Sequence, residues 1–154
     1  MLEKPKVLIV EGRFYENITD MLCMGAIAVL DEAGMDYERI AVPGAFEIPQ
    51  AIQFAVQSMK NKSSLNYYSG FIGFGCVIRG ETSHYDYVCQ ESSRALMNIV
   101  LQHQIALGFG ILTVENHDQA LERADIRKKN KGKDVAQACL RMMEVKKMFH
   151  TVPQ

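Results

Sequence analysis

The chain has 154 residues, enough for one domain, and folding at this length buries roughly 70% of the surface that the unfolded chain exposes. Hydrophobic residues make up 48% of the sequence and charged residues 23%, as in soluble globular proteins. The formal net charge of -1 argues against a nucleic-acid partner, because nucleic-acid binders are normally basic. No apolar stretch approaches the ~20 residues needed to cross a bilayer, so we expect residues 1–154 to form a single domain without a membrane partner.

The N-terminus and the cysteines indicate the cellular compartment. Residues 1–6 lead directly into an apolar strand and lack the apolar core and cleavage site of a signal peptide. The cysteines occur singly within apolar patterns, without CxxC spacing; they are Cys23, Cys76, Cys89 and Cys139. Such cysteines are typical of reduced core thiols. We therefore expect a cytoplasmic protein without a disulfide framework or a metal site.

Strand-like and helix-like segments alternate along the chain. The apolar run Val7–Val10 predicts a first strand, and the pattern from about residue 17 to residue 33 predicts a helix that ends at Gly34, a natural C-cap. Residues 39–42 predict a second strand, closed by Pro43 and Gly44. Apolar residues at helical spacing then predict one buried helix face, formed by Ile48, Ile52, Ala55, Val56 and Met59.

The third strand is a continuous apolar run. It covers residues 71–78 and follows a polar connector at residues 61–64. The next helix begins near His84 and lasts until about Gln104. Its predicted buried side carries Val88, Ser92, Ala95, Leu96, Ile99 and Val100.

The last third of the chain continues the alternation. Residues 106–113 predict a fourth strand and residues 118–124 a short helix. The basic segment 127–133 precedes a final helix. The predicted buried face of that helix is Val135, Ala138, Cys139, Met142 and Met143.

Continuous apolar strands, each followed by a helix, indicate a parallel sheet that is covered on both faces. Right-handed crossovers then give an α/β fold: a flavodoxin-like three-layer α/β/α sandwich with a four-stranded parallel sheet. In such sheets ligands bind beyond the carboxyl ends of the strands. Unusual sequences follow all four strands, at residues 12–14, 43–47, 79–84 and 113–116. We expect these strand ends to converge on one site.

The third strand end combines features of an anion site and of proton transfer. It passes through Arg79 and Gly80 to Thr82 and Ser83, and a glycine turn with hydroxyl groups at a helix start presents backbone N–H groups that favour an anion. His84 follows, and histidine is the residue type best suited to proton transfer near neutral pH. This pattern predicts a site for a small phosphorylated molecule. Thr82 and Ser83 are equally typical of simple N-caps, and His84 of a solvated surface residue.

The other strand ends also allow two interpretations each. Phe14 either stacks on a planar heterocycle or packs in the core. Glu47, with the N–H groups of Ala45 and Phe46, either holds a polar ligand or stabilises the first turn of a helix.

Two basic positions near the end of the chain are similarly ambiguous. Arg123 lies near the end of the short helix, where a cation offsets the helix dipole. Lys131 lies in the basic segment, which is either a solvated connector or an attractor for an anionic substrate.

These segments together resemble the lumazine synthase family, which catalyses the penultimate step of riboflavin biosynthesis. They occur in the family's order at similar intervals and cover nearly the whole chain; they are residues 12–14 with 18–19, 42–49, 75–87, 109–116, 119–124 and 130–132. The resemblance implies condensation of 5-amino-6-ribitylamino-uracil with 3,4-dihydroxy-2-butanone 4-phosphate. The products would be 6,7-dimethyl-8-ribityllumazine, phosphate and water, and neither a metal nor an organic cofactor is expected.

The resemblance also implies roles for particular residues. Phe14 matches the aromatic that stacks on the pyrimidine ring. The positions that hold the ribityl chain or border the ring are Ala45, Phe46, Glu47, Val77 and Ile78. Glu81 and Thr82 match the turn that takes the phosphate, and His84 matches the general acid/base. In this family a neighbouring subunit completes each site, and the matching positions are Phe109 (its aromatic), Arg123 (its phosphate-binding arginine) and, as a further basic position, Lys131.

Members of the family assemble as pentamers, decamers or icosahedral shells of pentamers, so we expect at least a homopentamer with sites between subunits. The alternatives are a non-catalytic binder of flavins or lumazines on the same fold, a scaffold with a vestigial site, and a riboflavin synthase of the archaeal type. His84 together with Arg123 argues against a mere binder, and the complete set of phosphate-binding positions argues against a riboflavin synthase.

Overall fold

A computed structural model describes residues 4–61 and 67–150 of the chain. The elements in chain order are β1 (Lys6–Gly12), α1 (Glu16–Glu32), β2 (Asp36–Val42), the 3-10 turn η1 (Ala45–Glu47), α2 (Ile48–Met59), β3 (Gly70–Ile78), α3 (His84–His103), β4 (Leu107–Val114), α4 (His117–Ala124) and α5 (Lys131–His150). The predicted alternation of strands and helices is confirmed, with small differences at the ends of the elements. Of the predicted polar connector, residues 62–64 lie outside the described residues.

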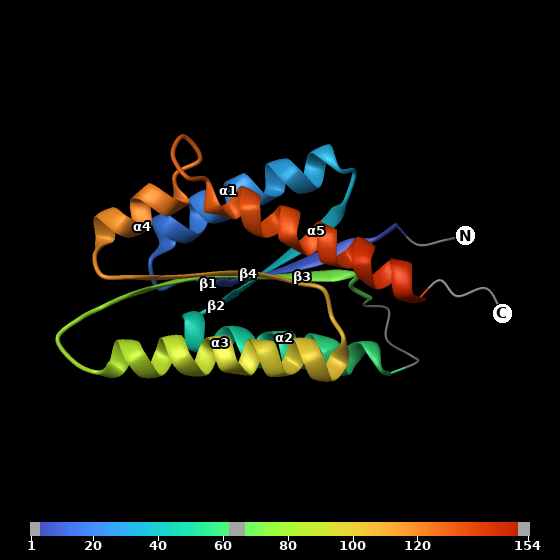
Figure 1. Cartoon of the computed structure of the whole chain (residues 1–154), viewed down its shortest axis with the longest axis horizontal. Helices are drawn as coiled ribbons and strands as arrows, with labels where there is room; N and C mark the ends of the chain where they lie inside the picture. Colours follow the sequence, from blue (N-terminus) through green and yellow to red (C-terminus); the bar gives the residue numbers. More distant parts are fainter. Residues whose placement is uncertain (1–3, 62–66, 151–154) are drawn as a thin grey trace.

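The four strands form one parallel sheet in the order β2-β1-β3-β4. Figure 1 shows α1, α4 and α5 on one face of the sheet and α2 and α3 on the other. The predicted three-layer α/β/α sandwich with a four-stranded parallel sheet is confirmed. The central strands β1 and β3 are almost entirely buried, which explains why their sequences are continuous apolar runs.

Alternation along β1 divides the core into two layers. Val7 and Ile9 belong to the core under α1 and α5, whereas Leu8 and Val10 belong to the core over α2 and α3. The buried faces predicted for α2 and α3 are confirmed. Within the part of the chain that the structure describes, no helix is long and apolar enough to cross a membrane.

The buried face predicted for the last helix is wrong at two positions. Ala138 and Met142 are exposed, whereas Ala136 is fully buried beside the correctly predicted Val135, Cys139 and Met143. The helix α5 packs against both α1 and β4, so its buried stripe is centred differently from that of a helix lying on a sheet alone. It also begins at Lys131, within the segment that was predicted to be a basic connector.

The turns that follow β1 and β2 touch at the carboxyl edge of the sheet. We call residues 12–15 the β1–α1 turn and residues 43–47 the β2–α2 turn. A Cβ atom added to Gly12 would lie 2.7 Å from the carbonyl carbon of Gly44 and 2.9 Å from the nitrogen of Ala45. The backbone N–H of Arg13 donates to the carbonyl oxygen of Val42 at 3.0 Å. The missing side chain at Gly12 therefore allows the two turns to meet.

Adding a methyl group at this contact should push the turns apart. We expect Gly12→Ala to lower the free energy of unfolding by roughly 1–3 kcal/mol, the usual cost of overpacking. Gly80→Ala is the control, because a Cβ there meets no atom within 4 Å, and its effect should stay within about 0.5 kcal/mol. Urea unfolding at a fixed protein concentration measures both, and equal losses would contradict the close-contact explanation.

Candidate functional site

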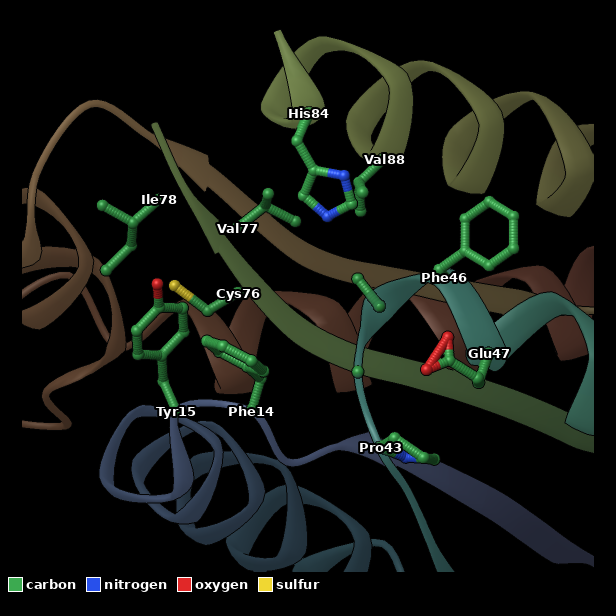
Figure 2. Close-up of a pocket in the computed structure, with 12 residues that line it drawn as sticks. Phe14, Tyr15, Pro43, Phe46, Glu47, Cys76, Val77, Ile78, His84 and Val88 are labelled. Carbon is green, nitrogen blue, oxygen red and sulfur yellow. The ribbon is translucent and has the colours of Figure 1, made fainter. Parts of the chain in front are cut away.

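A cavity of about 540 Å³ opens at the carboxyl edge of the sheet, a volume typical of a small-molecule site. Its walls come from the β1–α1 turn, the β2–α2 turn, the end of β3 and the first turns of α3 (Figure 2). The predicted convergence of strand ends is therefore confirmed for three of the four strands.

Seven of the predicted site residues line this cavity: Phe14, Ala45, Phe46, Glu47, Val77, Ile78 and His84. In Figure 2, the side chains of His84 and Phe14 enter the cavity from different elements, α3 and the β1–α1 turn. The side chain of Phe14 is 73% exposed, so the interpretation of Phe14 as a core residue is wrong. Phe46 is also exposed and adds a second aromatic ring to the rim.

Pro43 and Gly44, which belong to the predicted strand-end segment 43–47, also line the cavity, whereas sequence reasoning missed three lining residues, which are Tyr15, Cys76 and Val88. Their positions carried a usable signal. Cys76 directly precedes Val77 at the end of β3, and Val88 lies one helical turn after His84 on the same face of α3. The ring of Tyr15 meets that of Phe14 edge to face, with centroids 4.9 Å apart.

The cysteine at the cavity is a neutral thiol. Burial raises the pKa of Cys76 to about 12, so the thiol stays protonated at neutral pH. All four cysteines are free. Among residues 4–61 and 67–150, no group of three or more His, Cys, Asp or Glu side chains is placed to hold a metal ion.

Only one of the two candidate hydroxyl groups, that of Thr82, caps the start of α3. The backbone N–H of His84 donates to the hydroxyl oxygen of Thr82 at 3.3 Å. Ser83 occupies the N-cap position, but its side chain accepts no capping hydrogen bond because its backbone is already helical there. The hydroxyl of Thr82 therefore caps one N–H at the start of α3, as the N-cap interpretation allows, whereas the side chain of Ser83 does not. Glu81 and Thr82 are exposed beyond the end of β3.

Two carboxylates pair with Arg79, which directly follows β3. The guanidinium of Arg79 donates to Glu115 at 2.9 Å and to Asp86 at 3.2 Å, and it lies over the ring of Tyr85 with its carbon 4.3 Å from the ring centroid. The hydrogen bond with Asp86, aided by the charge of Glu115, raises the pKa of Arg79. The positive charge of Arg79 is therefore already compensated by its own chain.

Phe109, Arg123 and Lys131 do not line the cavity of their own chain. Phe109 is exposed on β4 and is paired with Gly73, well before the end of the strand. Arg123 lies in the last turn of α4, where its guanidinium donates to the carbonyl oxygen of Gln119 at 3.0 Å. Lys131 is exposed at the start of α5. Both helices cover the face of the sheet opposite to α3 (Figure 1).

Comparison with known proteins assigns the family. A family model described as 6,7-dimethyl-8-ribityllumazine synthase matches residues 4–147. The chain is 52% identical over 149 residues to the protein of that name from Bartonella tribocorum, which covers 97% of this chain and 95% of the relative. The chain belongs to the 6,7-dimethyl-8-ribityllumazine synthase family. It is also 49% identical over 146 residues to the relative from Agrobacterium fabrum, with 95% of this chain and 97% of that relative covered. The identity with the relative from Paramagnetospirillum magneticum is 44% over 142 residues, which cover 92% of this chain and 95% of that relative.

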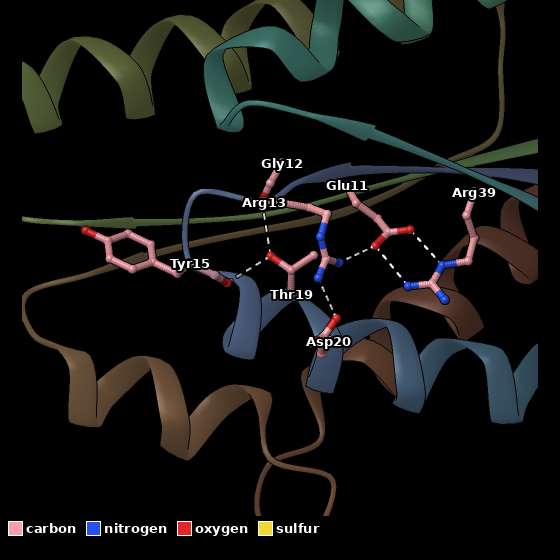
Figure 3. A network of polar contacts seen from close by, with 7 residues as sticks. All are labelled: Glu11, Gly12, Arg13, Tyr15, Thr19, Asp20 and Arg39. Carbon is pink, nitrogen blue, oxygen red and sulfur yellow. Dashed lines mark hydrogen bonds and ion pairs between the residues drawn. The ribbon is translucent and has the colours of Figure 1, made fainter.

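In this member of the lumazine synthase family, an ion network around the buried carboxylate of Glu11 lies directly behind the β1–α1 turn (Figure 3). The side chain of Glu11, at the end of β1, is only 4% exposed. Its carboxylate accepts two hydrogen bonds from Arg39, at 2.7 and 3.0 Å, and one from Arg13 at 2.7 Å. The other arm of Arg13 donates to Asp20 on α1 at 2.7 Å. The network thus joins β1, β2 and α1 beneath the turn.

The electrostatics of this network favour the ionised carboxylate. Burial acts to raise the pKa of Glu11, but the hydrogen bonds and charge of Arg39, together with contributions from Cys23 and Arg13, outweigh burial and hold the pKa below its usual value. Burial also raises the pKa of Cys23 to about 12, so that neighbour remains a neutral thiol. Glu11 is therefore a permanent anion between two guanidinium groups at neutral pH.

The lowered pKa of Glu11 predicts a contribution to stability that acid removes. Because the unfolded chain binds the proton more readily, this contribution is present above the ordinary glutamate pKa of 4.5 and is lost as the pH falls through the lower value of the folded state. We expect Glu11→Gln to flatten the fall in unfolding free energy between about pH 5 and pH 3. Urea unfolding across this range, at constant protein concentration, measures the slope.

Glu144→Gln serves as the control for this measurement. Glu144 pairs with Arg141 at the surface, where an exposed ion pair contributes little to stability. The unfolding free energy of Glu144→Gln should fall with pH at the same slope as that of the parent chain. A Glu11→Gln variant with the unchanged parental slope would show that the network does not stabilise the charged carboxylate.

Proposed function

We propose that the protein is a lumazine synthase that condenses 5-amino-6-ribitylamino-uracil with 3,4-dihydroxy-2-butanone 4-phosphate. The products are 6,7-dimethyl-8-ribityllumazine, phosphate and water, as riboflavin biosynthesis requires. One observation carries the proposal: seven residues singled out by the family's motifs, from separate segments of the chain, line one cavity. The alternative of a non-catalytic binder has no support from the relatives named above, since each carries the enzyme's name.

The cavity suits the pyrimidine substrate. In the proposed complex its ring stacks on Phe14, and such a contact contributes roughly 0.5–1.5 kcal/mol beyond the burial of area. Val77 and Ile78 border the ring with apolar surface at the end of β3. The β2–α2 turn lies beside them and offers the carboxylate of Glu47 to the hydroxyl groups of the ribityl chain.

His84 is the proposed general acid/base. The amine adds to the ketone, water leaves to give an imine, phosphate departs, and a second condensation closes the ring. Amine addition and loss of water move protons between nitrogen and oxygen, and phosphate leaves after a proton is removed from the carbon between the imine and the carbon that bears the phosphate. One imidazole can carry these protons near neutral pH. Holding the two substrates together supplies much of the remaining acceleration. As the family resemblance implies, the proposal invokes neither a metal nor an organic cofactor, and the proposed partners are cytoplasmic small-molecule substrates and further copies of the chain.

The phosphate group requires a cation from outside the chain's own cavity. The hydroxyl of Thr82, the backbone near Glu81 and the N-terminus of α3 favour an anion. However, Arg79 is already paired with Asp86 and Glu115, so the local side chains leave no surplus of positive charge there.

Arg123 is the proposed source of that cation. It lies on the opposite face of the sheet from α3, so we propose that it reaches the phosphate of a neighbouring subunit, together with the ring of Phe109 and with Lys131 as a further basic residue. The protein then acts as a homopentamer at least, with its sites between subunits.

Incubation of the purified protein with both substrates tests the reaction. We expect lumazine absorbance and free phosphate to appear faster than in the same mixture without protein. His84→Ala should lower kcat by roughly 10²-fold, the lower end of the range for a positioned general acid or base, with smaller changes in KM. His103→Asn, at the far end of α3, is the matched control and should keep the parental kcat. Absence of product above the spontaneous rate would refute the enzyme assignment.

A mixing experiment tests whether the sites are shared. We expect Arg123→Ala to raise the KM for the phosphorylated substrate sharply. When the His84→Ala and Arg123→Ala variants are unfolded and refolded together, activity should recover to about a quarter of the parental value, because each site draws the two residues from different subunits at random. Each variant refolded alone is the control. No recovery on mixing would refute the shared site while leaving the reaction itself untouched.

A further inference from the structure

The orientation of the Phe14 ring depends on structure outside the Phe14 side chain itself. Its side chain is 73% exposed, so close packing does not hold the ring, which meets Tyr15 edge to face. A stacking surface is effective only if its plane is already set when the ligand arrives. The backbone of the β1–α1 turn must therefore supply the orientation.

Two sets of hydrogen bonds hold that backbone. The hydroxyl of Thr19 shares its one proton between the carbonyl oxygens of Gly12 and Tyr15, at 3.1 and 3.2 Å, and so spans the turn from inside (Figure 3). The backbone N–H of Arg13 donates to Val42 and thereby ties the turn to the end of β2.

The side chain of Arg13 supplies a third connection. One guanidinium nitrogen donates to Glu11 before the turn, and another donates to Asp20 on α1 after it. Arg13 directly precedes Phe14, and it does not line the cavity itself. Its influence on a ligand must therefore pass through the backbone to Phe14.

Charge compensation alone does not explain Arg13. Arg39 already binds both oxygens of the Glu11 carboxylate, and it does so from β2 without touching the β1–α1 turn. What Arg13 adds is a connection between the end of β1 and α1. The two arginines therefore share one carboxylate but differ in what they hold.

We propose that Arg13 is a positioning residue for the pyrimidine substrate: clamped between Glu11 and Asp20, it fixes the β1–α1 turn so that the ring of Phe14 faces the β2–α2 turn in the stacking orientation. This inference rests on the proposed function for the identity of the ligand. It assigns a role in binding to a residue that lies outside the cavity.

A double-mutant cycle tests the proposal, with Arg13→Met, Phe14→Ala and the double variant. We expect Arg13→Met to raise the KM for the pyrimidine by roughly three- to tenfold, the range expected for losing an aromatic contact, without raising the KM for the phosphorylated substrate. In the Phe14→Ala background the same change should alter the pyrimidine KM by less than about twofold, because residues acting through one contact are not additive. Full additivity would overturn the proposal.

Arg39→Met is the matched control, since it removes the other guanidinium from the same carboxylate. It should lower the melting temperature at least as much as Arg13→Met and leave the pyrimidine KM unchanged. An equal rise in KM for both variants would overturn the positioning role. If Arg13→Met fails to fold, Asp20→Asn replaces it, because Asp20 is exposed and holds only one arm of the arginine; a parental pyrimidine KM in that variant would also overturn the proposal.

Direct binding separates this inference from the proposed reaction. Fluorescence titration of each variant with 6,7-dimethyl-8-ribityllumazine measures stacking without turnover. Weaker binding by Arg13→Met that depends on Phe14 supports the clamp even if the parent chain forms no product, in which case the proposed reaction alone fails. If the parent chain forms product but Arg13→Met binds the lumazine as tightly as the parent chain does, the clamp is refuted and the proposed reaction is not.

Discussion

The contact between the β1–α1 and β2–α2 turns at Gly12 and Gly44 controls the shape of the cavity. Parallel strands bring their carboxyl ends to one edge, but a sheet alone leaves neighbouring turns free to separate. Here the missing Cβ at Gly12 lets the two backbones touch, and Arg13 then hydrogen bonds to the end of β2. Phe14 and Glu47 consequently lie on adjoining walls of a single cavity. A larger residue at this one contact would alter the spacing of both walls.

Two ion networks that contain arginine flank the cavity, and the positive charge in each is compensated by carboxylates. Arg13 and Arg39 share the buried Glu11 behind the β1–α1 turn, and Arg79 lies between Asp86 and Glu115 at the other end. Neither network therefore presents free positive charge to a ligand. The chain uses these cations to hold backbone segments in place, which fits the proposal that an arginine from another subunit binds the phosphate.

The fold was predictable because its signals are local. Apolar strands, helical spacing and a glycine C-cap at Gly34, whose φ is +67°, all report on nearby residues. Cavity residues that follow strand ends, such as Phe14 and Glu47, were predictable because parallel topology brings those ends together, whereas Val77 was named only through the family resemblance. The buried face of α5 was not, because it depends on two neighbours that lie far away in sequence. The ion network was missed for the same reason: Glu11 and Arg39 lie 28 residues apart, and no local pattern reveals that they meet.

The sharing of Glu11 by two guanidinium groups limits how the sequence can drift over evolutionary time. Replacing the carboxylate alone would leave two neighbouring cations without their common anion, and replacing either arginine would leave the other to hold it alone. Substitutions at positions 11, 13 and 39 are therefore coupled to one another. Among descendants of this chain, loss of the carboxylate should be accompanied by loss of at least one of the arginines, even though none of the three residues lines the cavity.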